Sequence, residues 1–413
     1  MHLEAYESVV GSEEIAEIRA LARHLRGLKV QHINSTRVGG GVAEILARLT
    51  PMMNELGIEA QWSVMTAKPA FFEVTKAIHN ALHGATDLVT DSMFRLYSAE
   101  AMANRDLVDK EADLVVLHDP QPLPLIRTQR RGRRRTIWRC HIDLSLAQIG
   151  VWGLLRPMVE RCDAAVFHLV DYAKELLIPQ FIIPPAIDPL SDKNRDLSSE
   201  EIRKVLGRFS IDPSRPIVLQ VSRFDFLKDP LGVIDAYKIA KKSVDCQLVL
   251  AGGSAADDPE GEKVLQLVLE RAQGDQDIHV LNLSPDSHVE INALQRAASV
   301  VVQKSLREGF GLVVTEAMWK GKSVIGGAVG GIRNQIIQGV TGFLVNTVEG
   351  TAFRIKELVA NPDLAQRFGE AGREYVRTNF LLTQYLKSWM VLILSVVQRQ
   401  TRGVLELRGE KRR

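Results

Sequence analysis

Short runs of apolar residues alternate with longer segments of helical periodicity through the first half of the chain. A run of about four to eight apolar residues between turn signals predicts a buried strand. The runs of this kind are Leu28–Ile33, Ala60–Met65, Leu114–His118, Thr136–Cys140 and Ala164–Leu169. Between them, segments such as Val42–Glu55 and Phe71–Leu82 repeat their apolar residues with the helical period. Strands that alternate with helices predict a parallel sheet covered by helices on both faces.

The alternation stops at a proline-rich segment and then starts again. Pro184, Pro185 and Pro189 hold the chain extended, which predicts a linker. After Pro213 the predicted strands are Ile217–Val221, Gln247–Ala251, His279–Leu283, Val300–Gln303, Ser323–Ile325 and Gly342–Val345. We therefore expect two doubly wound, Rossmann-like α/β domains that face each other across a cleft.

The predicted domains are residues 1–189 and residues 190–380. The stretch Leu382–Arg399 is long and helical in period, so we expect residues 381–413 to form a helix that packs back on the first domain. Ligands of open α/β sheets bind at the carboxyl ends of the strands. Residues that directly follow a strand are therefore the candidates for function.

The composition is that of ordinary globular domains. Apolar residues make up 46% and charged residues 25% of the 413 residues, which excludes disordered and collagen-like proteins. Lys and Arg number 52 and Asp and Glu 50, and a net charge of +2 argues against a dedicated nucleic-acid-binding protein. Cys140, Cys162 and Cys246 form no CxxC pair, so they indicate neither a zinc site nor a disulfide framework.

Three scattered thiols suit the reducing cytoplasm. The segment Met1–Glu4 lacks the basic and then apolar pattern of a signal peptide. The apolar stretch Trp389–Val397 is far shorter than the ~20 residues that a membrane span requires. We therefore expect a cytoplasmic protein without a membrane partner.

Three consecutive glycines, Gly39, Gly40 and Gly41, lie between the first predicted strand and the first long helix. Their backbone N–H groups can approach an anion closely, and a helix N-terminus adds roughly half a positive charge. The segment is neither a G-x-G-x-x-G fingerprint nor a Walker loop, so it does not favour dinucleotide binding or ATP hydrolysis. A phosphate-binding loop is the interpretation that we favour, and a flexible loop before a helix is the alternative.

Two cations follow the first strand of the second domain. Arg223 and Lys228 are five positions apart, and together they can clamp a diphosphate, Arg223 through its planar fork and Lys228 as a point charge. The alternative is a pair of solvated surface cations, with Arg223 paired to Asp225.

The most specific motif surrounds two carboxylates, Glu308 and Glu316, with a Gly-x-Gly turn between them at Gly309 and Gly311. In a continuous helix the two acids would be up to ~12 Å apart. Such a separation exceeds the ~5–9 Å of the paired acids of a glycoside hydrolase. It suits two acids that bind different hydroxyl groups of one long ligand.

Two further sets of residues follow predicted strands. Gly330 and Gly331 belong to a second glycine-rich strand-to-helix turn. In the first domain, Asp119, His141 and Asp143 would form a polar wall that suits a hydroxylated acceptor. Singly, such residues are more often helix caps or turn formers.

Taken together, these motifs resemble the retaining GT-B glycosyltransferases of family 4, and within them the branch of trehalose glycosyltransferring synthases. The resemblance rests on the E-x7-E element from Glu308 to Glu316, on the pair of Arg223 and Lys228, and on the glycine loop Gly39–Gly41. It extends over nearly the whole chain and is weakest at Met1–Gly27, Asp91–Val108 and Val404–Arg413.

The resemblance implies a nucleoside-diphosphate glucose (ADP-, UDP- or GDP-glucose) as a substrate and no bound cofactor. By its analogy Glu316 would bind the ribose and Glu308 the donor glucose, while Arg223 and Lys228 would neutralise the diphosphate. The donor-binding residues that it implies are Gly39, Gly40, Gly41, Arg223, Lys228, Glu308, Gly309, Phe310, Gly311, Leu312, Glu316, Gly330 and Gly331. The catalytic residues would be Glu308, Arg223, Lys228, His141 and Asp119, and the acceptor-binding residues Asp119, His141 and Asp143.

The expected reaction is front-face transfer with retention, because no convincing nucleophile is present, and it would give α,α-trehalose from free glucose in a reversible step. A metal ion is not required on this interpretation. Asp275 and Asp277 spell a D-x-D pattern, but they precede a strand, which indicates a surface turn. The family also implies small-molecule partners and a homodimer.

Two alternatives remain open from the sequence. The acceptor could be a sugar phosphate or a glucan, and Arg37, Arg139 and Arg156 are the cations that a phosphorylated acceptor would need. The protein could instead be a non-catalytic nucleotide- or nucleic-acid-binding protein, supported by five arginines within Arg130–Arg135. No aromatic interleaving accompanies that run, so a solvated face or a subunit contact is the better interpretation.

Overall fold

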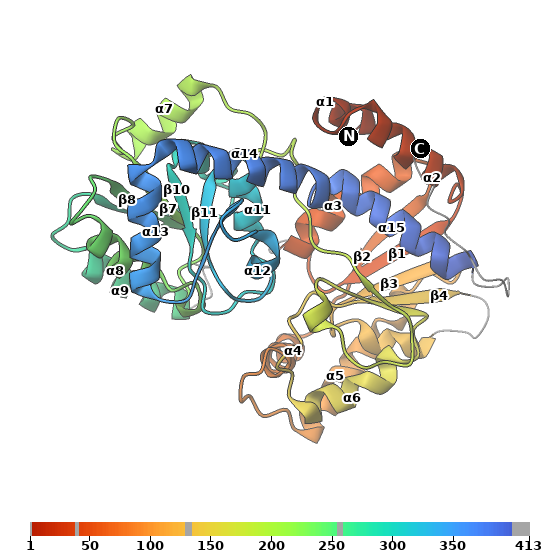
Figure 1. Ribbon diagram of the computed structural model, residues 1–413. Coiled ribbons are helices and arrows are strands. Elements are labelled where there is room, and N and C mark those ends of the chain that lie inside the picture. Colours follow the sequence, from red (N-terminus) through yellow and green to blue (C-terminus); the bar gives the residue numbers. More distant parts are fainter. Residues whose placement is uncertain (1, 38–40, 129–133, 254–258, 399–413) are drawn as a thin grey trace.

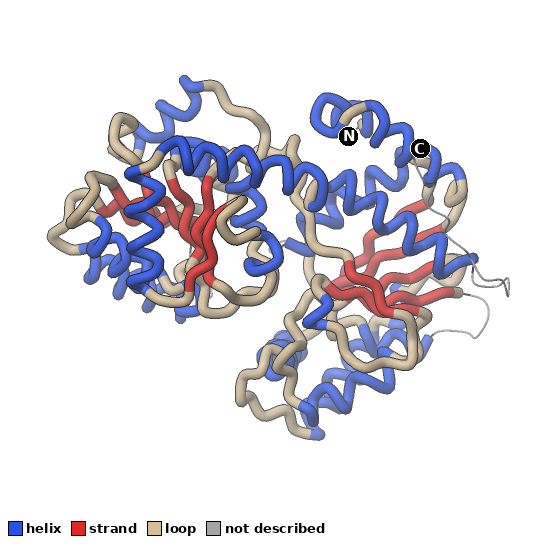
Figure 2. Tube along the Cα trace, viewed as in Figure 1, coloured by secondary structure: helices blue, strands red, loops and turns tan. Residues whose placement is uncertain are grey.

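Two parallel six-stranded sheets, each with helices on its faces, form the molecule (Figures 1 and 2). The computed structural model describes residues 2–37, 41–128, 134–253 and 259–398. This architecture is the predicted α/β fold, with one sheet in each half of the chain.

The first sheet has the strand order β2-β1-β3-β4-β5-β6, and all of its neighbouring strands are parallel. Its strands are β1 (Lys29–Asn34), β2 (Glu59–Val64), β3 (Leu114–His118), β4 (Arg135–Arg139), β5 (Ala164–Phe167) and β6 (Gln180–Ile182). The five predicted strands are present, each within two residues of its expected ends. The short edge strand β6 was not predicted, because none of its three side chains is buried.

The second sheet has the strand order β12-β11-β10-β7-β8-β9, again wholly parallel. Its strands are β7 (Ile217–Val221), β8 (Gln247–Gly252), β9 (Ile278–Asn282), β10 (Val300–Gln303), β11 (Ser323–Gly327) and β12 (Gly342–Val345). All six predicted strands are confirmed. β7, β8, β10 and β11 are buried along their whole length, which explains their unbroken apolar runs.

Helices connect the strands within each half. Those of the first half are α1 (Glu7–Val10), α2 (Ser12–Arg23), α3 (Gly41–Glu55), α4 (Pro69–Leu82), α5 (Asp91–Ala103) and α6 (Ile149–Val159). Those of the second half are α7 (Ser199–Arg208), α8 (Pro230–Ala240), α9 (Pro259–Ala272), α10 (His288–Ala297), α11 (Leu312–Trp319), α12 (Ile332–Gln335), α13 (Val348–Ala360) and α14 (Pro362–Asn379). Capping residues fix the N-termini of several of these helices. Ser198 and Glu201, for example, form a capping box at the N-terminus of α7.

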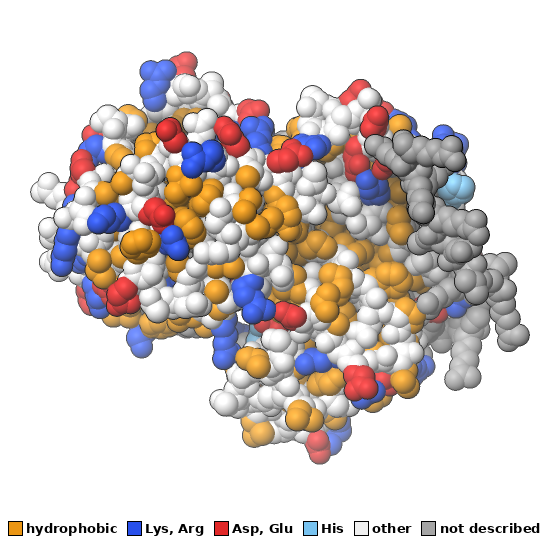
Figure 3. Space-filling model, in the orientation of Figure 1, with side chains coloured by type: hydrophobic (Ala, Val, Ile, Leu, Met, Phe, Trp, Pro, Cys, Tyr) orange, Lys and Arg blue, Asp and Glu red, His pale blue; other side chains and the backbone are white. Residues whose placement is uncertain are grey.

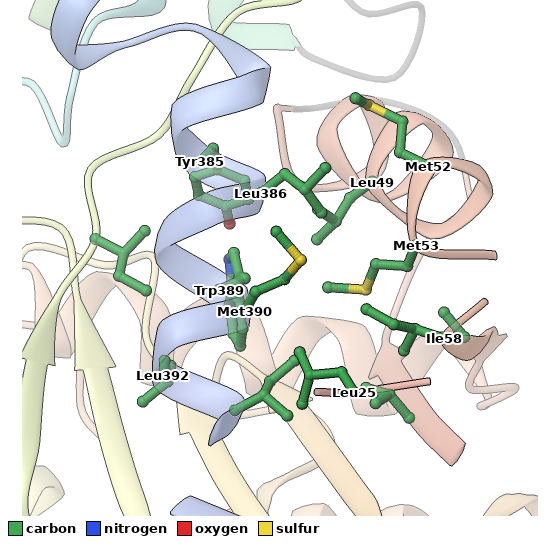
Figure 4. Close-up of a cluster of buried hydrophobic side chains, with 14 of the residues drawn as sticks. Leu25, Leu49, Met52, Met53, Ile58, Tyr385, Leu386, Trp389, Met390 and Leu392 are labelled. Atoms are coloured by element: carbon green, nitrogen blue, oxygen red, sulfur yellow. The ribbon is translucent and has the colours of Figure 1, made fainter. Parts of the chain in front are cut away.

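Helix α15 (Leu382–Val397) crosses back from the second sheet and packs on α2 and α3 of the first half (Figure 1). Tyr385, Leu386, Trp389 and Met390 point from α15 into a cluster with side chains of α3 and its neighbours (Figure 4). At the edge of this contact, Lys387 Nζ lies 2.6 Å from Glu14 Oε2 of α2. In the part of the chain that the structure describes, no helix is both long and apolar enough to cross a membrane.

The proline-rich segment and the start of α15 cross between the two halves side by side. The amide of Ile187 donates to the carbonyl of Phe380 at 2.9 Å, and the amide of Leu382 donates to the carbonyl of Ile187 at 2.9 Å. The two crossings therefore form one short parallel ladder.

We predict that Trp389→Ala destabilises the protein by about 3–5 kcal/mol, because it removes a large, fully buried side chain from the contact of α15. Val391 lies on the same helix but is 52% exposed, so Val391→Ala is the matched control and should change the stability by less than about 0.5 kcal/mol. Urea unfolding followed by circular dichroism measures both. Equal stabilities for the two variants would contradict the packing of α15 on the first half.

Candidate active site

Glu308 lies in the loop that connects β10 to α11, and it contacts the side chain of Lys228. Lys228 Nζ lies 2.6 Å from Glu308 Oε2, and both side chains are largely buried. Lys228 ends a short 3₁₀ helix after β7, where Gln220 holds its carbonyl oxygen at 2.8 Å. The next residue, Asp229, has a left-handed backbone (φ +50°) and caps α8. The structure thus brings the predicted Glu308 and Lys228 together at the carboxyl edge of the second sheet.

Arg223 follows the same strand, β7, but its side chain is 62% exposed. Its Nη2 atom lies 3.5 Å from Asp225 Oδ2, which is a long contact. The pairing with Asp225 is the one that the alternative interpretation of the sequence expected. The assignment of Arg223 to a diphosphate remains a prediction.

Glu316 lies on α11 and lines a cavity of about 310 Å³ between the two halves of the chain. Gly41 and Leu312, both predicted donor-binding residues, line the same cavity. Gly41 and Leu312 also lie close together, since a Cβ atom on Gly41 would be 3.1 Å from Leu312 Cδ1. Lys193 and Glu44 also line this cavity, and Lys193 Nζ lies 2.9 Å from Glu44 Oε1. Gly39 and Gly40 lie outside the described residues.

Gly330 and Gly331 pack against the loop that carries Glu308. A Cβ atom on Gly330, whose φ is +44°, would collide with the carbonyl oxygen of Glu308. A Cβ atom on Gly331 would come within 2.5 Å of the Cα atom of Phe310. Gly311 has φ +86° and begins α11. These glycines therefore shape the Glu308 loop, whatever ligand they also approach.

On the first sheet, Asp119 and His141 lie together. Asp119 has a left-handed backbone (φ +66°), a conformation that is uncommon for residues other than glycine and recurs at functional sites. Its Oδ1 atom accepts a hydrogen bond from the amide of His141 at 2.7 Å. Burial raises the pKa of the Asp119 carboxyl to about 7, although the amide of His141 and the charge of Arg139 act in the opposite direction. The carboxylate of Asp119 thus fixes the turn that carries His141.

The loop of Glu308 meets the first half of the chain directly. The hydroxyl of Tyr172 donates to the carbonyl of Gly309 at 2.7 Å. Arg307 Nη1 donates to the carbonyl of His83 at 3.3 Å, and Gly309 faces the carbonyl of His141. The Glu308 loop of the second half therefore lies directly against the first half, close to His141.

His83 lies among these groups, although no sequence pattern singles it out. Burial lowers the pKa of His83, and the charges of Asp143, Arg307, Glu308 and Lys228 all act on it. Asp143 also accepts a hydrogen bond from the amide of Ser145 at 2.8 Å. Tyr172 was likewise missed, yet it follows β5 closely, and the same strand-end rule that selected Asp119 would have found it.

Two family models match the chain: "Trehalose synthase, N-terminal domain" at residues 32–174 and "Glycosyl transferases group 1" at residues 200–375. The trehalose synthase of Thermococcus litoralis is 45% identical over 399 residues, covering 95% of this chain and 97% of that protein. The trehalose synthase of Rubrobacter xylanophilus is 43% identical, covering 92% and 94% of the two chains. The chain belongs to the trehalose synthase family of GT-B glycosyltransferases.

Solved structures support the same fold. A trehalose-phosphate synthase from Burkholderia xenovorans superposes with a TM-score of 0.70 over 90% of this chain and 100% of that one, at 14% identity. The sucrose-phosphate synthase of Thermosynechococcus elongatus gives a TM-score of 0.65 over 90% and 98%, at 19% identity. The chain is thus a GT-B glycosyltransferase that takes part in trehalose-related glycosyl transfer.

In this member of the trehalose synthase family, the two acids of the D-x-D pattern form ion pairs with basic side chains. Asp277 pairs with Arg215 at 2.5 Å and with Lys241 at 2.8 Å, and Asp275 pairs with Lys241 at 2.7 Å. These cations hold the pKa of Asp277 below its ordinary value. The arrangement agrees with the structural turn that the sequence favoured at this position.

The exposed surface gives the nucleic-acid interpretation little support. Basic and acidic side chains are interspersed over the visible face of both halves (Figure 3). Most of the arginine run falls outside the described residues. Its last two members are described. Arg135 pairs with Asp163 at 2.8 Å, and Arg134 donates a hydrogen bond to the carbonyl of Asp109 at 3.2 Å.

We predict that Gly330→Ala impairs catalysis, because the new Cβ atom must displace the backbone of Glu308. The matched control is Gly339→Ala, since Gly339 also has a positive φ (+73°) but a Cβ atom there would meet no heavy atom within 4 Å. Both variants should lose roughly 1–2 kcal/mol of stability from backbone strain. Only Gly330→Ala should lose glycosyl transfer in a product assay, and similar activities of the two folded variants would contradict the role assigned to this contact.

Proposed function

We propose that the protein transfers glucose from a nucleoside-diphosphate glucose to free glucose and forms α,α-trehalose with retention of configuration. The observation that carries the proposal is the ion pair of Lys228 and Glu308, on a loop whose Gly309 lies near the carbonyl of His141, in a chain that matches trehalose synthases over nearly its whole length. The reaction would be reversible, and the physiological compartment that we propose is the cytoplasm.

The donor would bind mainly to the second half of the chain. Arg223 and Lys228 would neutralise the diphosphate, and the backbone amides of Gly40 and Gly41 would approach it from the other side. Glu316 would accept hydrogen bonds from the ribose, since it lines the inter-domain cavity together with Gly41. Glu308 would bind the hydroxyl groups of the donor glucose near the reacting carbon.

The proposed chemistry follows from these charges. When the bond between C1 and the phosphate oxygen breaks, negative charge develops on the diphosphate and positive charge on the glucosyl carbon. A preorganised donor that stabilises the leaving group can contribute roughly 3–4 kcal/mol. The new bond forms on the face that the leaving group vacates, and a phosphate oxygen takes the proton of the acceptor hydroxyl. The cations of the protein serve the diphosphate, so the proposal needs neither a metal ion nor a bound cofactor.

The environments of three arginines favour free glucose over a phosphorylated acceptor. Arg139 is fully buried, and its guanidinium donates to the carbonyls of Phe167 at 2.9 Å and Ile183 at 2.6 Å. Arg156 pairs with Glu160 at 2.8 Å, and Arg37 lies over the ring of Trp62. The expectation that these three cations serve an acceptor phosphate is therefore not supported at Arg139, which no ligand can reach.

The test combines ADP-, UDP- or GDP-glucose with either glucose or glucose 6-phosphate and identifies the product by NMR of its anomeric protons. We expect α,α-trehalose from glucose. Lys228→Met should lower kcat by about 10²–10³-fold, because it removes a preorganised donor. Lys356, exposed on α13, supplies the control Lys356→Met, which should behave like the unmodified protein.

Product formed only with glucose 6-phosphate would move the protein to the phosphate-dependent branch. A β-linked product would refute retention. No turnover with any donor, together with tight binding of RNA, would refute the proposed enzyme altogether.

A further inference from the structure

Four histidines, three of them buried and His141 half-buried, lie in a row toward the carboxyl ends of adjacent strands of the first sheet. His32 comes from β1 and His118 from β3, while His141 follows β4 and His168 follows β5. These four strands are neighbours in the sheet order β1-β3-β4-β5. The row therefore crosses four neighbouring strands of the first sheet.

The rings are joined end to end by hydrogen bonds. His32 Nδ1 lies 3.0 Å from His118 Nε2, His118 Nδ1 lies 3.0 Å from His141 Nε2, and His141 Nδ1 lies 3.0 Å from His168 Nε2. Each contact needs one protonated and one bare nitrogen. If all rings are neutral, the proton position on one ring dictates the positions on the other three.

Two observations hold the rings neutral. Burial lowers the pKa of each of the four, and the positive charge of Arg139 acts in the same direction on His118, His141 and His168. Both nitrogens of His141 are already bonded to other rings. Protonation of His141 would keep both bonds only if His168 moved its own proton from Nε2 to Nδ1.

The two ends of the row indicate which proton order is adopted. Among the described residues, His168 Nδ1 and His32 Nε2 have no hydrogen-bond partner. The positive charge of Arg139 acts on His168 and disfavours an additional proton there, so a bare nitrogen is favoured at that end. At the other end, the ring of His32 stands edge-on to the ring of Trp389, with 5.7 Å between the centroids, and an N–H group is tolerated beside an aromatic ring.

We propose that the four histidines form one neutral chain, each protonated at Nε2, and that His118 and His168 act through it as positioning residues for His141. This inference rests on the proposed function, because its consequence concerns glucosyl transfer. His141, the half-buried member of the row, then holds a fixed, uncharged ring beside the Glu308 loop. An imidazolium at that position would repel the positive charge that develops on the transferred sugar.

The chain also reaches the catalytic loop. The ring of His168 stands edge-on to Phe310, two residues after Glu308, with 6.1 Å between the centroids. Loss of His168 would thus free one nitrogen of His141 and remove a contact of the Glu308 loop at the same time. His118→Leu disturbs His141 from the opposite side, and no ring contact joins His118 to Phe310 among the described residues.

The first test is the NMR spectrum of the ¹⁵N-histidine-labelled protein without any substrate, so its result does not depend on the proposed function. We expect His118 and His141 each to show a protonated Nε2 and a bare Nδ1 at neutral pH. Exchanging tautomers, the opposite proton order or a charged His141 would overturn the proposal.

The second test is kinetic and uses the donor and acceptor that the product assay identifies. His118→Leu and His168→Leu should each lower kcat by roughly 10- to 100-fold, since small displacements of a positioned group cost rates of this order. For His118→Leu the KM for the donor should hardly change, because the donor is bound mainly by the other half of the chain. His168→Gln, whose amide can replace the bond to His141 Nδ1, should restore most of the rate.

His279→Leu on β9 of the other sheet is the control for the loss of a histidine, and thermal unfolding establishes that each variant is folded. A folded His118→Leu protein with an unchanged kcat would show that the chain serves stability alone and would overturn the inference. Failure of every variant and of the unmodified protein to transfer glucose would instead refute the proposed function and leave the NMR result standing.

Discussion

The chain passes between its two sheets twice, and the two passages are held together by hydrogen bonds between Ile187 and the residues Phe380 and Leu382. Asp188, the next residue of the first passage, is buried, and its Oδ1 atom accepts hydrogen bonds from Tyr6 at 3.0 Å and from the amide of Leu190 at 2.9 Å. The two passages are therefore joined to each other and to the N-terminal segment. The cavity that contains Glu316 is lined by the same segment, so its width depends on the crossing.

The charges that matter for function are few and local. A net charge of +2 therefore says little about what the protein does. Lys228 is paired with Glu308 across loops that follow two different strands, β7 and β10, so its ammonium group is already oriented before any ligand arrives. On the proposed function, the diphosphate meets a cation whose position needs little reorganisation, which is the property that electrostatic catalysis requires.

The strands and the main catalytic candidates could be predicted because both follow simple rules. A strand buried on both faces is a continuous apolar run, as in Leu114–His118, and ligand-binding residues follow such strands, as Glu308 and Lys228 do. The rest depends on contacts that no local pattern contains. Strand β6 exists because of its pairing with β5. The sequence leaves Arg139 open as a cation for a phosphorylated acceptor, because nothing local reveals that it is buried.

Arg139 also connects the C-terminal helix α15 to the strands that carry the histidine row. Its guanidinium donates to the carbonyls of Phe167 and Ile183, and Tyr385 of α15 raises its pKa, against the effect of burial. A buried cation that lost one of these partners would be costly, because its desolvation would remain uncompensated. Trp389, one turn further along α15, packs beside His32. The helix that returns from the second half thus packs against the histidine row. The position of His141 therefore depends on residues that are more than 240 positions away in the sequence.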